Sequence, residues 1–269
     1  MGYEVPDLSE VVREQPMPLL FATVSGAHLY GFPSRDSDVD LRGVHILPVE
    51  EVVGLRPGPE TLQRIWVRDG VELDLVTHDL LKFCRLLLRP NGYVLEQLLS
   101  PIVALTTRGH QDLRNLTPEL VTSRHAHHYR GFAHTQWRLF EKTGELKPLL
   151  YTFRALFTGV HLMRTGEVVA HLPTLLTKLD GPEYLRPLID AKALGEHRAL
   201  AGVPYRPTKS RLEQDVKLWH DELRHAQEHS ELPERPSADE QINDLVVDLR
   251  VRTRSGRATD DRDAPGPAA

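Results

Sequence analysis

The sequence predicts an α+β fold in which a small mixed sheet with flanking helices precedes an all-helical domain. Short β-type runs bounded by turn residues occur only in the first part of the chain. From about Thr117 the pattern changes to long helical periodicities without clear strands. We therefore place a domain boundary near residues 106–118. The predicted parts are an α+β domain over 1–112, a helical domain over 113–250 and a disordered tail over 251–269.

The bulk composition is that of a globular protein, with 269 residues, 40% of them apolar and 26% charged. The formal net charge of −5 argues against a general polyanion binder, although it allows a local basic patch. The single cysteine, Cys84, excludes an intrachain disulfide. Segment 1–16 has charges and prolines where a signal peptide needs an apolar core, and no run approaches the ~18 apolar residues of a membrane span. We predict a cytoplasmic protein without membrane association.

The first elements follow from short patterns. Residues 4–15 can form a short helix that ends before two prolines. An apolar run with β-branched residues at its end predicts a strand over Leu19–Val24. A second strand is expected over Asp38–Ile46, after a turn rich in Gly, Pro and Ser. The Pro- and Gly-rich residues 48–60 predict a loop.

The Asp69-Gly70 pair between two alternating runs predicts a β-hairpin over residues 62–76. In the second run of this hairpin, Glu72 and Asp74 share one face. The helices that follow are predicted from a cap at Thr77 or Asp79 to Leu88, and then over 94–99, 124–141, 148–165, 170–179, 182–194, 208–230 and beyond a cap at Ser237.

The stretch Leu19–Leu47 carries the candidate chemistry. Gly26 breaks the run of the first strand, and the turn offers backbone N–H groups that can face a phosphate. In the second strand, Asp38 and Asp40 point to the same face because strand side chains alternate. Two adjacent carboxylates repel each other unless a cation lies between them, and Mg²⁺ is a hard cation that takes oxygen ligands. The pattern therefore predicts metal-dependent chemistry on a nucleoside triphosphate, with Mg²⁺ or Mn²⁺.

A two-metal nucleotidyl transfer site requires a third carboxylate on a neighbouring strand. The hairpin offers Asp74 and Glu72 for this role. For either residue the alternative is a solvated strand face.

Several short motifs resemble the DNA polymerase β-type nucleotidyltransferase superfamily. The motifs are Gly26, the run Ser37-Asp38-Val39-Asp40 and the run Arg42-Gly43-Val44. The sequence resembles more closely the bacterial and phage branch of predicted nucleotidyltransferases, some of which are linked to RNA repair. The similarity continues through Leu80–Phe83 and Asn91–Leu99, and it covers the helical remainder only loosely.

This resemblance implies a polymerase β-like nucleotidyltransferase core and a role for each matching residue. Asp38 and Asp40 would hold both metal ions. Asp74, with Glu72 as the less favoured choice, would ligate the ion that activates the acceptor hydroxyl. The phosphates of the nucleotide would lie against Ser25, Gly26, Ala27 and Ser37.

One position departs from the pattern of this superfamily. Its members have a serine after the glycine, where this chain has Ala27. In relatives this serine hydroxyl contacts a triphosphate oxygen, a hydrogen bond worth on the order of 1 kcal/mol or somewhat more. Ala27 keeps only the backbone N–H. Arg42, from the matching Arg-Gly-Val, would steady charge or the strand at the nucleotide site.

A second constellation lies in the helical part. Residues 124–164 contain seven basic and two acidic residues with interleaved aromatics, a mixture that suits phosphates and bases. Arg124 and His128 are spaced to share one helix face and are candidate nucleotide ligands. Arg154 sits in an apolar run and needs either a buried acid or a bound phosphate. The cluster of histidines at 125–128 is not expected to bind zinc, because adjacent helical positions point in different directions.

The leading interpretation is an enzyme that transfers a nucleoside monophosphate from a nucleoside triphosphate, such as ATP, to an acceptor hydroxyl. An RNA end, a protein side chain and a small molecule all remain open as acceptors, and the oligomeric state is open as well. The non-enzyme alternative is a degenerate nucleotidyltransferase fold that binds a nucleotide, RNA or a partner protein. Metal-dependent glycosyltransferases also use Asp-x-Asp, but they do not need the glycine turn or a third carboxylate.

Overall fold

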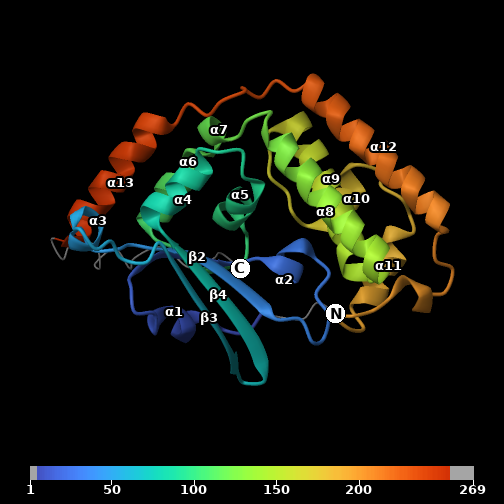
Figure 1. Cartoon of the computed structure of the whole chain (residues 1–269), viewed down its shortest axis with the longest axis horizontal. Helices are drawn as coiled ribbons and strands as arrows, with labels where there is room; N and C mark the ends of the chain where they lie inside the picture. Colours follow the sequence, from blue (N-terminus) through green and yellow to red (C-terminus); the bar gives the residue numbers. More distant parts are fainter. Residues whose placement is uncertain (1–4, 255–269) are drawn as a thin grey trace.

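The computed structural model describes residues 5–254, with side chains through residue 251. It contains one five-stranded sheet in the order β3-β4-β2-β1-β5, and helices flank it on both faces (Figure 1). The strands are β1 Leu19–Val24, β2 Val39–His45, β3 Thr61–Arg68, β4 Val71–Asp79 and β5 Val103–Leu105. The predicted α+β fold with a small mixed sheet is confirmed.

The helices follow the predicted order, and their bounds differ from the predictions by a few residues. In the first half they are α1 Ser9–Arg13, α2 Gly26–Tyr30, α3 Glu50–Val53, α4 Leu80–Leu87, α5 Gly92–Leu99, α6 Arg108–Asn115 and α7 Thr117–Leu120. In the second half they are α8 His125–Thr143, α9 Leu146–Thr165, α10 Leu172–Lys178, α11 Leu185–Lys192, the 3₁₀ helix η1 Leu200–Gly202, α12 Lys209–Glu228 and α13 Asp239–Arg254.

The strand pairing is mixed. β1 runs antiparallel to β2 and β5, β3 runs antiparallel to β4, and β2 lies parallel to β4. The predicted hairpin is present, and both residues of its turn have positive φ, 51° at Asp69 and 79° at Gly70. This backbone is that of a type I′ turn, which matches the twist of antiparallel strands. The parallel pairing of β2 with β4 determines which side chains meet at the candidate site.

Three elements between residues 103 and 120 were not predicted from the sequence. β5 has only three residues at a sheet edge, too few to show an alternating pattern. α6 has a strongly polar sequence, in which Leu113 is the buried apolar side chain. Gly109 allows α6 to approach Leu20 of β1 closely, since a Cβ there would lie 2.6 Å from its Cδ1. Tertiary contact therefore stabilises these elements more than local propensity does.

Apolar side chains cover both faces of the sheet. On one face a small core forms between residues of α1, such as Val11, and residues of β1, β2 and β4, such as Leu41 and Leu75. On the other face a larger core begins with residues such as Phe21 and Val44 and continues through α4, α5, α8, α9 and α12. The helical part therefore shares its core with one face of the sheet.

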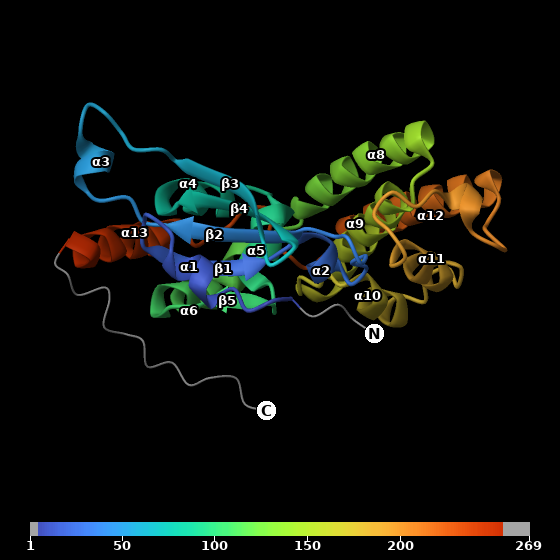
Figure 2. The ribbon, with the colours of Figure 1, turned by 90° about the horizontal axis from the view of Figure 1, so that it is seen from below.

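The last helix returns to the first half of the chain. α13 packs against α4 and α6, on the far side of the molecule from α11 (Figures 1 and 2). The boundary predicted at residues 112 and 113 falls inside α6. The functional division between residues 1–112 and 113–250 stays a prediction. Residues 251–254, predicted as part of a disordered tail, belong to α13, and residues 255–269 lie outside the described chain.

A buried ion pair attaches α13 to the sheet. Arg250 donates to Asp79 Oδ2 over 2.6 Å and to the carbonyl of Leu47 over 2.8 Å. The two charged side chains are only 7% and 4% exposed. Asp79 also caps α4 by accepting from the backbone N–H of Leu81.

We predict that Arg250→Met lowers the free energy of unfolding by about 3–5 kcal/mol, because it leaves the Asp79 carboxylate buried without its partner. Urea denaturation measures this change. The double variant Asp79→Asn/Arg250→Met should recover part of the loss. As a control, Arg224→Met removes the exposed pair with Asp221 and should cost no more than ~1 kcal/mol. Equal losses for Arg250→Met and Arg224→Met would contradict the assignment.

Candidate active site

Two strands bring the candidate carboxylates together. In the parallel pairing of β2 with β4, Asp40 lies directly opposite Asp74. Arg42 follows two residues later on the same face of β2. Its Nη2 donates to Asp40 Oδ1 over 2.5 Å and to Asp74 Oδ2 over 2.9 Å. One guanidinium therefore bridges the two carboxylates.

Arg42 is itself fixed by the backbone. Its Nη1 donates to the carbonyl oxygen of Asp74 over 2.6 Å and to that of Leu41 over 3.0 Å. The side chain is about 10% exposed. The role of Arg42 predicted from the sequence, steadying charge and strand, agrees with this geometry.

The turn after β1 lies against the same carboxylate. The backbone N–H of Ser25 donates to the carbonyl oxygen of Asp40 over 2.8 Å. Gly26 has φ of +62°, and a Cβ at this residue would lie 1.8 Å from Asp40 Oδ2. Glycine is required here both for the backbone conformation and for the approach of the Asp40 side chain.

The electrostatics of the site are dominated by negative charge. Burial raises the pKa of Asp40, the positive charge of Arg42 opposes this shift, and the carboxylates of Asp38 and Asp74 add to it. The carboxylates of Asp38, Asp40 and Asp74 thus outnumber the two cations that act on Asp40, Arg42 and Lys147. The cluster therefore attracts a further cation.

The chemistry of these donors fits a divalent ion, since Asp40 of β2 and Asp38, which lies just before β2, supply hard carboxylate oxygens close to each other. Within residues 5–251, however, no three His, Cys, Asp or Glu side chains converge as a ready-made metal site. The guanidinium of Arg42 instead contacts the carboxylates of both Asp40 and Asp74. The predicted set of Asp38, Asp40 and Asp74 is thus gathered in one place, and its use as metal ligands stays a prediction.

The register distinguishes the two candidates for the third carboxylate. Asp74 pairs with Asp40, whereas Glu72 precedes the first paired residues, Val39 and Leu73. Glu72 is exposed and lies beside Val67 of β3. The geometry favours Asp74, which also lies 3.5 Å from Gln63 Nε2 through its Oδ1.

The predicted phosphate ligands lie in two groups beside the carboxylates. Ser25 and Ala27 are buried next to Gly26, and Ser25 Oγ has no hydrogen-bond partner among the described residues. An orphaned hydroxyl at this turn can donate to an incoming oxygen. Ser37 Oγ instead bonds to Ser34 Oγ over 2.9 Å and to Glu196 over 3.0 Å.

The assignment of Arg154 to a phosphate is wrong. Arg154 Nη1 donates to Glu96 Oε1 over 2.5 Å, and both side chains are at most 2% exposed. Its guanidinium also lies 3.9 Å from the ring centroid of Tyr30. From the apolar run around Arg154, the sequence predicted that its partner is either a buried acid or a phosphate. In the structure the partner is a buried acid, Glu96.

The other two predicted ligands of the helical part lie apart from the carboxylates. Arg124 lines a separate depression of about 340 Å³ together with Pro90 and Glu234. His128 packs beside Gly92 and Tyr129, and burial, followed by the charge of Arg154, lowers its pKa to about 4. His128 is therefore neutral near pH 7. Nucleotide binding by Arg124 and His128 stays a prediction.

Sequence reasoning missed a group of residues at this site that come from α9 and from the segment after α11. Lys147 and Lys192 both bond to Glu196, which in turn contacts the loop that precedes Asp38. Lys147 was counted in the basic stretch, but no local motif connects it with a glutamate 49 residues away. Only the packing of the helical part onto the loop reveals the group.

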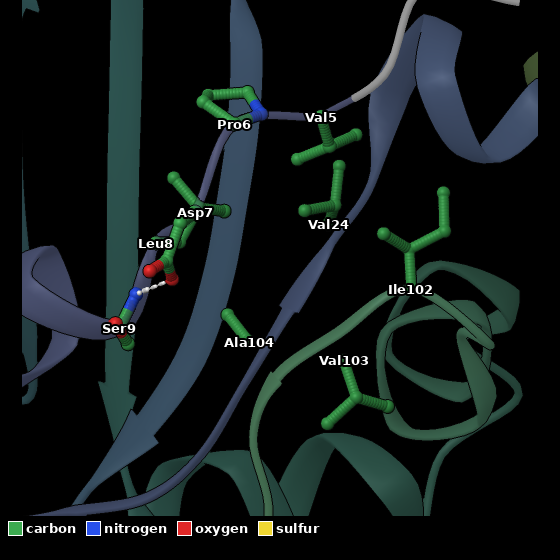
Figure 3. Close-up of a pocket in the computed structure, with 9 residues that line it drawn as sticks. All are labelled: Val5, Pro6, Asp7, Leu8, Ser9, Val24, Ile102, Val103 and Ala104. Carbon is green, nitrogen blue, oxygen red and sulfur yellow. Dashed lines mark hydrogen bonds between the residues drawn. The ribbon is translucent and has the colours of Figure 1, made fainter. Parts of the chain in front are cut away.

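A small cavity of about 230 Å³ lies on the opposite face of the sheet (Figure 3). Its lining comes from the N-terminal segment, the end of β1 and β5: Val5, Pro6, Asp7, Leu8, Ser9, Val24, Ile102, Val103 and Ala104. Asp7, the charged residue of this lining, accepts from the backbone N–H of Ser9 over 2.9 Å. This mostly apolar cavity is separated from the carboxylates by the sheet.

Comparison with known protein families identifies the family of the chain. The model of the RNA repair pathway DNA polymerase beta family matches residues 4–248. The chain belongs to this family. The match includes the strands that carry Asp38, Asp40 and Asp74, and it extends through the helical part.

Two other proteins are similar in sequence to this polymerase beta family member. It is 33% identical over 160 residues to the uncharacterized protein MJ0002 of Methanocaldococcus jannaschii, covering 59% of this chain and 64% of that protein. It is 27% identical over 153 residues to the uncharacterized protein YcgL of Bacillus subtilis, covering 55% and 57%. The matches thus span less than two thirds of both relatives.

A solved nucleotidyltransferase-like protein from Exiguobacterium sibiricum is 14% identical, with a TM-score of 0.31 and coverage of 96% of this chain and 79% of that one. Among the described residues of the polymerase beta family member, no helix is both long and apolar enough to cross a membrane.

We predict that Gly26→Ala lowers the free energy of unfolding by about 1–3 kcal/mol, because the new methyl group displaces the Asp40 carboxylate and the backbone has positive φ. Chemical denaturation measures the loss. Gly131→Ala is the matched control, since a Cβ there meets nothing within 4 Å. That helix position should gain roughly 0.5–1 kcal/mol. A Gly26→Ala variant as stable as the wild type would contradict the close approach of Asp40.

Proposed function

We propose that this protein is a nucleotidyltransferase that moves a nucleoside monophosphate from a nucleoside triphosphate to an acceptor hydroxyl and releases pyrophosphate. The observation that carries the proposal is the pairing of Asp40 with Asp74 directly beside the Gly26 turn. Membership in the polymerase beta family supports the same reaction class.

Each part of the site has a role in this reaction. Asp38 and Asp40 would hold divalent magnesium or manganese, which supplies charge neutralisation for the phosphates and activation of the acceptor. The backbone N–H groups of Gly26 and Ala27, together with the free hydroxyl of Ser25, would bind the phosphates. Asp74 lies on the side of Asp40 away from this turn, which makes it our candidate for the residue that meets the acceptor.

The bond changes balance as follows. The acceptor oxygen forms a bond to the α-phosphorus, and the bond from that phosphorus to the bridging oxygen of pyrophosphate breaks. The proton of the acceptor hydroxyl passes to a carboxylate of the site, for which Asp74 is the candidate. Arg42 keeps the Asp74 carboxylate oriented toward Asp40.

The acceptor that we would test first is an RNA end, since the family is described by an RNA repair pathway. A protein hydroxyl and a small-molecule hydroxyl are the other two classes. Transfer of label from an α-labelled triphosphate to each class distinguishes them directly.

A second candidate function rests on Arg42 and Ala27. Arg42 already compensates part of the carboxylate repulsion, and Ala27 lacks the serine hydroxyl of the superfamily pattern. A degenerate domain of this kind would bind a nucleotide, RNA or a partner protein without turnover.

We predict that a nucleoside triphosphate binds in the presence of magnesium and that Asp40→Asn weakens this binding at least tenfold, because a metal ligand is lost. Calorimetric titration of ATP, GTP, CTP and UTP, each with magnesium, measures the affinities and gives the base preference. The exposed Asp190→Asn variant is the matched control and should bind as the wild type does.

Pyrophosphate release separates the two candidate functions. Turnover with an acceptor that Asp40→Asn abolishes supports the enzyme. Nucleotide binding that survives in Asp40→Asn, with no pyrophosphate from the wild type, supports the degenerate binding domain.

A further inference from the structure

A cluster of charged side chains connects the helical part to the loop immediately before Asp38. Its centre is Glu196, which follows α11. Glu196 Oε2 accepts from Ser34 Oγ over 2.9 Å, from Ser37 Oγ over 3.0 Å and from Lys192 Nζ over 2.5 Å. The backbone N–H of Glu196 donates to Asp36 Oδ1 over 3.0 Å. The other oxygen, Oε1, accepts from Lys147 Nζ.

The two lysines on Glu196 differ in their surroundings. The side chain of Lys192 is 0% exposed, and its Nζ also donates to Ser34 Oγ over 2.8 Å. The side chain of Lys147 is 38% exposed and lies in the first turn of α9. Lys192 is thus a buried part of the loop contact, whereas Lys147 can leave Glu196 without exposing a buried charge.

Lys147 lies close to the candidate metal ligands. Burial lowers its pKa, but the carboxylates of Glu196, Asp38 and Asp40 outweigh this effect and raise it overall. Lys147 therefore carries its positive charge near neutral pH. This charge acts on the carboxylates of Asp38 and Asp40. Burial would raise the pKa of Glu196, but the two lysines lower it to about 2, so Glu196 is ionised as well.

The ammonium groups of Lys147 and Lys192 therefore both contact the single carboxylate of Glu196. One of the two positive charges is enough to balance the charge of Glu196. A triphosphate bound at Asp38 and Asp40 through a divalent ion brings several negative charges to this place. A lysine ammonium is a compact charge with three rotatable donors, which suits a phosphate oxygen. Arg154, which the sequence left open between a buried acid and a phosphate, is paired with Glu96 in the core.

We propose that Lys147 binds the β- or γ-phosphate of the nucleotide by exchanging Glu196 for a phosphate oxygen. Lys192 stays on Glu196 and keeps the loop of Ser34 and Ser37 in place during this exchange. The inference rests on the proposed function, because it assigns a ligand to the triphosphate of that reaction. The inference goes beyond the proposed function because it gives the helical part a defined contact with the substrate.

The test compares Lys147→Met with the wild type in calorimetric titrations of the magnesium complexes of ATP, ADP and AMP, or the same series of the preferred base. A charge-assisted hydrogen bond of ordinary strength corresponds to an affinity loss of about tenfold to hundredfold. We expect this loss for the triphosphate, a smaller one for the diphosphate if the γ-phosphate is the contact, and less than about threefold for the monophosphate. Lys147→Arg, which keeps the charge, should recover most of the triphosphate affinity.

Two further variants separate binding from folding. Lys209→Met removes a lysine that is 74% exposed and pairs with Glu213 at the start of α12, and it should change no affinity. Lys192→Met should lower the melting temperature, because Glu196 and Ser34 lose a buried partner, whereas Lys147→Met should leave it within a few degrees of the wild type. A Lys147→Met protein that binds the triphosphate as tightly as the wild type would overturn the inference and leave the proposed function intact. Equal loss for the triphosphate and the monophosphate would also overturn it. If the wild type binds no triphosphate, both the proposed function and the inference fail.

Discussion

The crowding of like charges at one end of the sheet is the constraint on which the rest of the site depends. The parallel register of β2 and β4 places Asp40 opposite Asp74, with Asp38 close by. Carboxylates this close require positive charge between them. The chain supplies it from two directions: Arg42 from within the strand and Lys147 from the helical part. In the function that we propose, a divalent ion would balance the negative charge that these two cations leave on the carboxylates.

Two ion pairs of α9 that differ in exposure connect the helical part to the first half of the chain. On one side Glu96 of α5 holds Arg154 of α9 in a fully buried pair, with the Tyr30 hydroxyl 3.1 Å from the second oxygen of Glu96. On the other side Glu196 connects Lys147 to the loop before β2 through a partly exposed pair. The buried pair fixes the helical part to the sheet, and the exposed pair can rearrange without opening the core. Rigid and adaptable contacts therefore lie on the same helix, α9.

The sequence alone predicted those features that depend on residues close to one another along the chain. Asp38 and Asp40 are two residues apart at the start of β2, so strand alternation was enough to predict that they lie close together. Asp74 required only that its strand lie beside β2. The need of Arg154 for a counter-charge was visible, but the choice of Glu96, 58 residues away, depends on how α9 packs on α5. Lys147 and Glu196 had no local pattern at all, because their meeting depends on the path of the chain between α9 and the end of α11.

The pair of Arg250 with Asp79 affects the order in which the parts of the chain fold during synthesis. The two residues are 171 positions apart, so the ribosome makes the sheet long before it makes the cation that neutralises the end of β4. At ordinary rates of synthesis that interval is about 10–30 s. During it the nascent sheet carries a carboxylate in an apolar setting and an uncovered α4, both of which favour an open, chaperone-accessible state. The end of the sheet opposite the candidate carboxylates is therefore expected to be completed late, when α13 packs against α4 and α6.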